Sequence, residues 1–156
     1  MLDSAWMMKR CDLPPEVRGW IDIVENGTYR SCEEQQLLVE HIQRCFETED
    51  IYIDRAQLSN YMKICEKYIP FELFPWQKFV IALHDCTYWR GSGQVRWPDL
   101  FCMLGRGAGK DGTIAVESMC LTSPYNGIRE YDVDICANNE EQAVRPVQDL
   151  TGFFED

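Results

Sequence analysis

The sequence predicts an α/β protein that begins with a helical region and continues into the start of a parallel sheet. Over residues 14–68, apolar side chains recur three and four positions apart, as they do on the buried face of amphipathic helices. An apolar run at 96–104 then leads into a glycine-rich loop, a helix and a second apolar run at 131–137. Strand, loop, helix and strand in this order form a βαβ unit. We therefore expect a helical N-terminal region, 1–68, followed by an α/β region, 69–156.

Three helices are expected in the N-terminal region, after an arm at 1–13 that shows no periodicity. Pro14-Pro15-Glu16 marks the first helix start, because proline is tolerated in a first helical turn, and Asn26-Gly27 marks its end near Glu25. Ser31, with Glu34 three residues later, predicts a capping box for the second helix. Asp54 is a candidate N-cap for the third helix.

The α/β region is expected to open with a helix from Pro75 to about Trp89 and a turn at Gly91-Ser92-Gly93. The strand predicted over 96–104 ends in residues that are apolar on both faces, as in a central parallel strand. A helix from Lys110 to about Leu121 should follow the glycine loop.

The chain then breaks at Ser123–Gly127, and the second predicted strand, 131–137, precedes a last helix capped by Asn138 or Asn139. A complete nucleotide-binding sheet has about five or six strands. Only two are recognisable, so the sheet is expected to be incomplete and the region truncated.

Charge and cysteine spacing exclude several classes of site. The formal net charge of −11 opposes general binding to nucleic-acid backbones or acidic membranes. No run of about 18 apolar residues is present, so no membrane-spanning helix is expected. The eight cysteines form no C-x-x-C pair, which disfavours zinc. We expect them to be reduced thiols of a cytoplasmic protein, most of them buried.

The glycine loop Gly105-Arg106-Gly107-Ala108-Gly109-Lys110 carries the clearest chemical signal. A loop that surrounds a phosphate must point its N–H groups inward, which requires positive φ angles and the absence of side chains. The following helix directs its N-terminal amides at the same group, and Lys110 adds a mobile positive charge. The pattern predicts binding of a nucleotide, with Gly105, Arg106, Gly107, Ala108, Gly109 and Lys110 as its contacts.

Two positions depart from the standard phosphate-binding pattern. Leu104 stands where the first glycine is usual, and Asp111 replaces the Ser or Thr that normally ligates Mg²⁺. A carboxylate can hold Mg²⁺ but also brings negative charge close to the phosphates. Asp111 is therefore the candidate metal ligand. Arg106 is either a cation that senses the γ-phosphate or a solvated loop side chain.

Three stretches together resemble the large terminase subunit of tailed bacteriophages, the ATPase and nuclease that packages DNA into proheads. They are Phe71–Phe79, Leu104–Gly112 and Asp134–Ala143, and their order and spacing match the start of that family's ATPase domain. The helical lead-in at 14–68 is also similar.

The resemblance implies that ATP and Mg²⁺ are cofactors and that Gln77 contacts adenine. The alternative for Gln77 is a solvated side chain at a helix start where Phe74 and Trp76 are core residues. In the full-length family member the partners would be viral double-stranded DNA, the small terminase subunit and the portal, with no membrane. The location would be the cytoplasm of the infected bacterial host.

The acids that such ATPases use are not recognisable. The family places an Asp-Glu pair after a later strand, whereas 133–137 is followed by Asn138-Asn139 and then Glu140-Glu141, which suit a helix start. Without these acids, the chain is expected to bind ATP without hydrolysing it. The nuclease domain is absent as well, so the chain is expected to be an N-terminal fragment or a truncated product. The alternatives are another phosphate-loop nucleotidase or kinase and a degenerate, non-hydrolysing prophage remnant.

Overall fold

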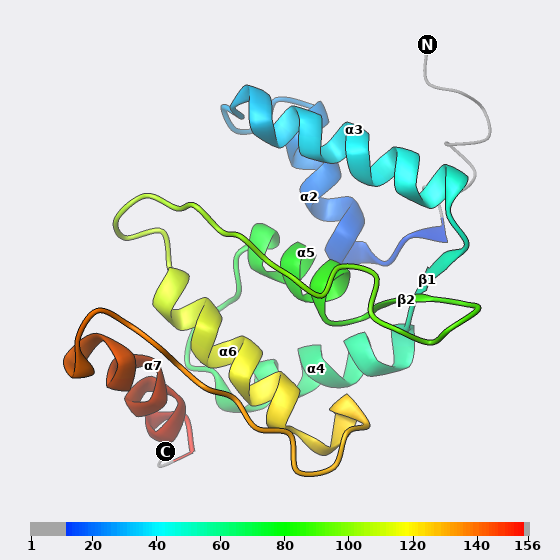
Figure 1. Ribbon diagram of the computed structural model, residues 1–156. Coiled ribbons are helices and arrows are strands. Elements are labelled where there is room, and N and C mark those ends of the chain that lie inside the picture. The colour runs from blue at the N-terminus through cyan, green and yellow to red at the C-terminus, as the bar shows by residue number, and fades with distance from the viewer. Residues whose placement is uncertain (1–11, 155–156) are drawn as a thin grey trace. The chain divides into compact units, whose positions relative to one another are not determined.

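The computed structural model describes residues 12–154, which contain both helices and strands (Figure 1). The chain divides into two compact units. The first unit combines the chain up to Arg55 with Leu73–Leu100, and the second combines Ala56–Glu72 with the chain from Phe101 onward. Both units therefore draw on residues before and after position 68. The predicted N-terminal arm lies outside the described residues, apart from its last two positions.

Three helices form most of the first unit: α2 (Pro15–Glu25), α3 (Glu33–Thr48) and α5 (Pro75–His84). Helix α2 packs against both of the others. Val17 and Ile21 of α2 are completely buried, and the Trp20 ring lies 6.3 Å from the ring of Phe79 in α5. Full burial of one aliphatic side chain stabilises a fold by about 1.5–3 kcal/mol, so this contact forms the core of the unit.

Local signals place these helix starts to within one residue. Helix α2 has the predicted bounds, and Gly27 beyond its end has a φ of +63°. The capping box of α3 lies one residue later than predicted. Its N-cap is Cys32, whose N–H donates to Gln35 Oε1 at 3.0 Å. Glutamine serves this position as well as glutamate does, which is why the box built on Ser31 and Glu34 was wrong.

A two-stranded antiparallel sheet completes the first unit. Strand β1 (Ile51–Ile53) pairs with β2 (Thr87–Trp89), with Tyr52 opposite Tyr88. The sequence predicted neither strand and extended the helix from Pro75 through β2. The helix instead ends at His84, and the Thr87 hydroxyl donates to the Ala82 carbonyl at 2.9 Å. The β-branched and aromatic residues of β2 favour a strand over a helix.

The parallel sheet predicted for the α/β region is not formed by the described residues. At the start of the 96–104 segment, Arg96 N–H donates to Thr87 O at 2.8 Å, which extends the hairpin around Gly93. Beyond this point the segment pairs with no strand among the described residues, and Phe101 and Met103 are 88% and 83% exposed. A buried parallel strand needs hydrogen-bonded neighbours. An apolar run alone was therefore not sufficient evidence for one.

The second predicted strand, 131–137, is likewise outside any ladder in the described part of the chain. Its side chains nevertheless alternate: Tyr131, Val133 and Ile135 are partly buried, whereas Asp132 and Asp134 are exposed. This alternation is the side-chain pattern of a strand without its pairing. The prediction was correct in pattern and wrong in secondary structure, because pairing depends on a neighbour that the pattern does not specify.

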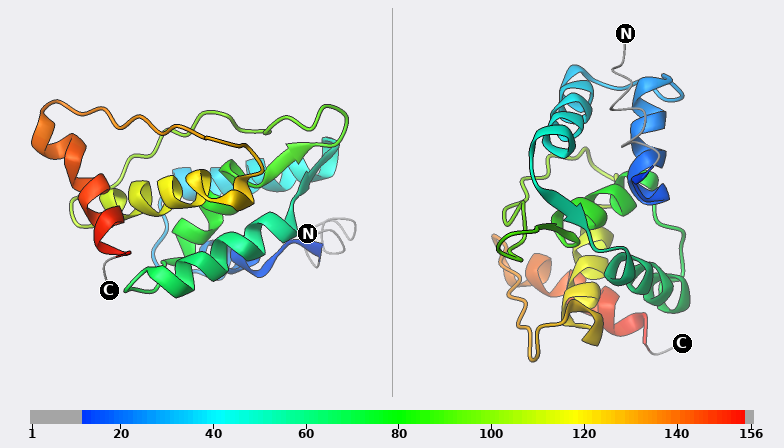
Figure 2. Two further views of the ribbon diagram at one scale, coloured as in Figure 1. Left: turned by 90° about the horizontal axis from the view of Figure 1, so that it is seen from below. Right: turned by 90° about the vertical axis from the view of Figure 1, so that its right-hand side faces the viewer.

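The second unit is helical. Its elements are α4 (Arg55–Tyr68), which begins at the unit boundary, α6 (Lys110–Thr122), the short 3-10 helix η1 (Pro124–Asn126) and α7 (Glu140–Gly152). Figure 2 shows α7 packed across α6 near the N-terminal end of α6. The starts of α4 and α6 follow the predicted positions, and Asn139 caps α7 by accepting from Gln142 N–H at 2.9 Å. No helix in residues 12–154 has the length and hydropathy needed to span a membrane.

The cysteines of the described region are free thiols, as predicted, although only some are buried. Cys45, Cys65, Cys86 and Cys120 are buried, whereas the others are exposed, namely Cys32, Cys102 and Cys136. The Cys65 and Cys120 sulfurs lie 3.9 Å apart within the second unit, as two thiols in contact. Cys11 lies outside the described residues.

The Glu49–Arg96 ion pair should stabilise the first unit by about 1 kcal/mol. Both side chains are largely buried, at 23% and 21% exposure, and Arg96 Nη2 donates to Glu49 Oε1 at 2.8 Å. The Glu49→Gln variant should therefore unfold at lower urea concentration than the wild type at pH 7. Glu40→Gln, on an exposed position of the same helix, is the control and should have no effect.

The pH dependence of this difference follows from the carboxyl group. The hydrogen bonds from Arg96 lower the pKa of Glu49. A carboxyl with a lowered folded-state pKa stabilises the protein above its unfolded pKa, and the stabilisation is lost as pH falls through the folded-state value. The gap between the wild type and Glu49→Gln should shrink under acid. A gap that widens as pH falls would contradict this assignment.

Thiol reactivity should separate the cysteines by burial. The thiolate is the reactive form, and burial raises the pKa of Cys45 and, most strongly, of Cys86. In folded protein at pH 8, Cys32 and Cys136 should react first with a disulfide reagent and Cys86 among the last. After unfolding without reductant, all eight cysteines should react. A count of six or fewer would show a disulfide and contradict the prediction.

Candidate phosphate-binding loop

The glycine loop enters α6 through two residues with left-handed backbone. Gly107 has a φ of +79° and Gly109 a φ of +84°, a region that residues with a β-carbon rarely adopt. Between them the chain turns tightly, and Ala108 N–H donates to Gly105 O at 3.2 Å. Two of the three glycines therefore have a conformational reason to be glycine.

The start of α6 has no side-chain cap. Gly109 is the N-cap, and it has no side-chain oxygen to accept from the first-turn amides. Its carbonyl is used within the helix, since it accepts from Thr113 N–H at 3.0 Å and from Thr113 Oγ1 at 2.9 Å. The amides of the first turn and the positive end of the helix dipole are thus available to an external anion.

Lys110 and Asp111 are the first two residues of α6, and their side chains form an ion pair. The lysine side chain is 61% exposed and the aspartate 37%. The second oxygen of Asp111, Oδ2, lies 4.0 Å from Nη1 of Arg145 on α7. The sequence singled out Lys110 and Asp111 but not Arg145, because contact between α6 and α7 is not encoded in local spacing.

Arg106 lies exposed at the turn of the loop, and within residues 12–154 it forms no ion pair. Its guanidinium is therefore not held by a carboxylate of the described residues. The same exposure fits a solvated loop residue, so both interpretations of Arg106 stay open.

Gln77 belongs to the first unit and is 2% exposed. Its Oε1 accepts from Phe74 N–H at 2.7 Å, which completes a capping box at the start of α5. The side chain therefore has a structural role at the helix start, which the sequence analysis did not assign to it. The alternative interpretation placed Gln77 in solvent and Phe74 in the core. It is wrong for both residues, because Gln77 is buried and Phe74 is 54% exposed.

Glu140 and Glu141 occupy the first turn of α7, behind the N-cap Asn139. This is the helix-start placement that the sequence predicted, where acidic side chains favour the helix dipole. The residues directly before them, 131–139, form no paired strand, so these glutamates are not the strand-end acidic pair that hydrolysis would use.

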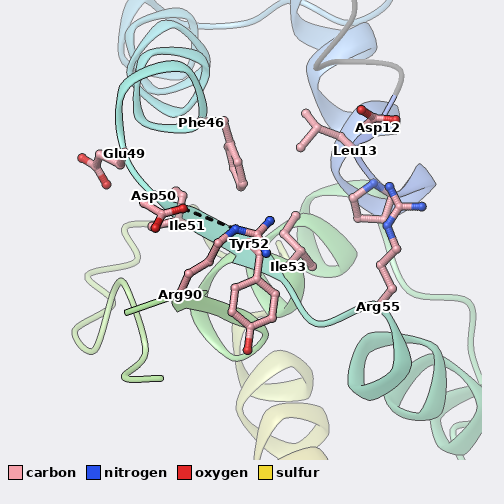
Figure 3. A pocket seen from close by; sticks show the side chains of 11 residues that line it. Asp12, Leu13, Phe46, Glu49, Asp50, Ile51, Tyr52, Ile53, Arg55 and Arg90 are labelled. Atoms are coloured by element: carbon pink, nitrogen blue, oxygen red, sulfur yellow. Dashed lines mark ion pairs between the residues drawn. The ribbon is translucent and has the colours of Figure 1, made fainter. Parts of the chain in front are cut away.

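A separate pocket of about 380 Å³ lies in the first unit, around β1 (Figure 3). Its lining mixes the aromatic rings of Phe46 and Tyr52 with charges of both signs. Arg90 Nε lies 3.4 Å from Asp50 Oδ1, and the Arg90 guanidinium lies 5.0 Å from the centre of the Tyr52 ring. The lining thus carries both acidic and basic side chains and selects no single ligand charge.

Three features define the candidate site. They are two glycines with left-handed backbone, a helix start without a side-chain cap, and an exposed lysine paired with a neighbouring aspartate. Comparison of the chain with protein-family models, with curated proteins and with solved structures finds no match.

Proposed function

We propose that this chain binds the phosphates of ATP through Gly105–Lys110 and is the ATP-binding N-terminal segment of a terminase-like DNA-packaging ATPase. The observation that carries the proposal is the left-handed turn at Gly107 and Gly109, which delivers Lys110 to the first position of an uncapped helix. Glycine amides, helix dipole and lysine are the three contributions that a phosphate-binding loop combines.

The overall negative charge means that nucleotide binding depends on the local charges of the loop. A chain with a net charge of −11 repels a nucleotide triphosphate at long range. Binding must therefore come from contacts at short distance, and Lys110 and Arg106 supply positive charges within the loop. In the complete motor, the partners would be viral double-stranded DNA, the small subunit and the portal, as the family resemblance implies.

The Mg²⁺ ion that accompanies ATP would be held at Asp111, directly or through water. A carboxylate oxygen is a normal Mg²⁺ ligand, and the ion would supply positive charge that offsets the charge of the phosphates. The segments 101–104 and 131–137 would take the two strand positions on either side of the loop and α6. The alternating burial of the second segment supports this arrangement.

A second candidate function is nucleotide-independent: a degenerate module that retains the loop without using it. The ion pair between Lys110 and Asp111 favours this alternative, because it occupies the ammonium that would contact a phosphate. Another phosphate-loop nucleotidase is also consistent with the loop alone. Nucleotide titration separates the module from the ATP-binding alternatives.

Lys110→Ala should weaken ATP binding at least about tenfold, because the variant loses a charge-assisted contact to the phosphates. Calorimetric titration of MgATP into the wild type and the variant measures the difference. Lys78→Ala, in α5 of the other unit, is the control and should bind as the wild type does. Equal affinity of a folded Lys110→Ala variant would remove the loop from the binding site.

The chain by itself should release phosphate from ATP only at background rate. Hydrolysis requires a positioned water and a metal held on its far side, in addition to phosphate binding. The segment 133–137 ends in Ala137 and is followed by Asn138 and Asn139, none of which is an acid. Glu140 and Glu141 then begin a helix. A malachite-green assay measures the release. Steady release that Lys110→Ala abolishes would show that the catalytic acids lie within this chain.

A further inference from the structure

One carboxylate beside the glycine loop lies between two cations from different helices. Asp111 Oδ1 pairs with the Lys110 ammonium, and Asp111 Oδ2 lies 4.0 Å from the Arg145 guanidinium. The two cations thus approach opposite oxygens of the same group. Neither contact is deeply buried, so both can rearrange without unfolding the helices.

The position of Arg145 is fixed by packing that does not involve charge. The Phe71 ring lies 6.0 Å from the Phe153 ring just past the end of α7, in an edge-on arrangement. The tip of Phe71, its Cζ atom, lies 3.5 Å from the position that a β-carbon on Gly112 would take. Phe71 therefore contacts the first turn of α6 and the end of α7 together.

A second aromatic pair and a buried proline hold the same helix. The Tyr68 and Phe154 rings are 5.1 Å apart, and Pro146 next to Arg145 is the buried residue of α7. These contacts hold the α7 backbone against α6, and the Arg145 side chain, 63% exposed, extends from it toward Asp111. The three-residue charge cluster is thus a consequence of how α7 packs on α6.

The Asp111 carboxylate has the charge and hydrogen-bonding capacity of a phosphate oxygen. While it holds the Lys110 ammonium, an incoming phosphate must compete with it for the same donor. A cation on the opposite oxygen lowers the cost of that exchange, because the carboxylate keeps a partner when the lysine leaves. Arg145 is in the position to be that cation.

We propose that Asp111 occupies Lys110 as an internal substitute for phosphate, and that Arg145 is the positioning residue which retains the carboxylate when Lys110 turns to the nucleotide. The proposal rests on the proposed binding of ATP at the loop. It concerns the metal-free exchange between carboxylate and phosphate, and Arg145 acts through Asp111 without touching the nucleotide.

Calorimetric titration of ATP in the presence of EDTA tests this exchange. Asp111→Asn should bind metal-free ATP about two- to fivefold more tightly than the wild type, because the competing charge is gone. Arg145→Gln should bind about two- to fivefold more weakly, and Arg145→Lys, which keeps the charge, should stay near the wild type. Arg129→Gln is the control, since Arg129 is 94% exposed and pairs with its chain neighbour Glu130 instead of with Asp111.

The double variant distinguishes a positioning role from direct contact. In the Asp111→Asn background, Arg145→Gln should have no further effect. A further loss of affinity in the double variant would mean that Arg145 touches the phosphates itself. Unchanged or weaker binding by Asp111→Asn alone would mean that the Asp111 carboxylate does not compete with phosphate for Lys110. Either result overturns the inference. Circular dichroism confirms that each variant is folded.

Wild-type binding and Lys110→Ala separate this inference from the proposed function. If the wild type binds, Lys110→Ala does not, and Arg145→Gln matches the wild type, only the role of Arg145 is overturned. If the wild type fails to bind ATP with or without Mg²⁺, the proposed function is overturned and the inference is overturned with it.

Discussion

Burial of α6 is the interaction on which the second unit depends. Ala115, Val116 and Cys120 are completely buried, and Met119 is 4% exposed. These side chains lie at positions i, i+1, i+4 and i+5 and form one buried stripe, so α6 cannot rotate about its axis without exposing them. Its first turn is therefore fixed in direction, and with it the loop that enters the helix. A binding loop on a rigid helix loses less conformational entropy when it binds than a free loop would.

Several features around α6 could be predicted because they depend on local backbone geometry. Gly109, Asn139 and Gly127 act through local geometry: a left-handed helix entry, a side-chain cap and a left-handed exit. Such features depend on a few neighbouring residues, so a single sequence specifies them. Helix starts and the conformation of the glycine loop could be predicted for this reason, and the one-residue error at Cys32 reflects two competing caps of similar quality.

Features that need a distant partner could not be predicted in the same way. The strands β1 and β2 exist because Tyr52 meets Tyr88 across 36 residues of sequence, as their numbers show. The 101–104 segment has the composition of a buried strand but no neighbour among the described residues. Arg145 likewise reaches the loop only through the packing of α7 on α6. Spacing within one segment carries none of this information.

Asp111 shows how one departure from a motif can have two opposite effects. A hydroxyl at this position would ligate Mg²⁺ without neutralising the lysine, whereas the carboxylate offers a stronger metal ligand and also a stronger partner for Lys110. The balance depends on whether another cation shares the carboxylate. With Arg145 beside it, Asp111 can leave Lys110 without becoming an unpaired charge. The substitution and the helix that compensates for it are therefore best understood as one unit, which ties the chemistry of the loop to the packing of α7.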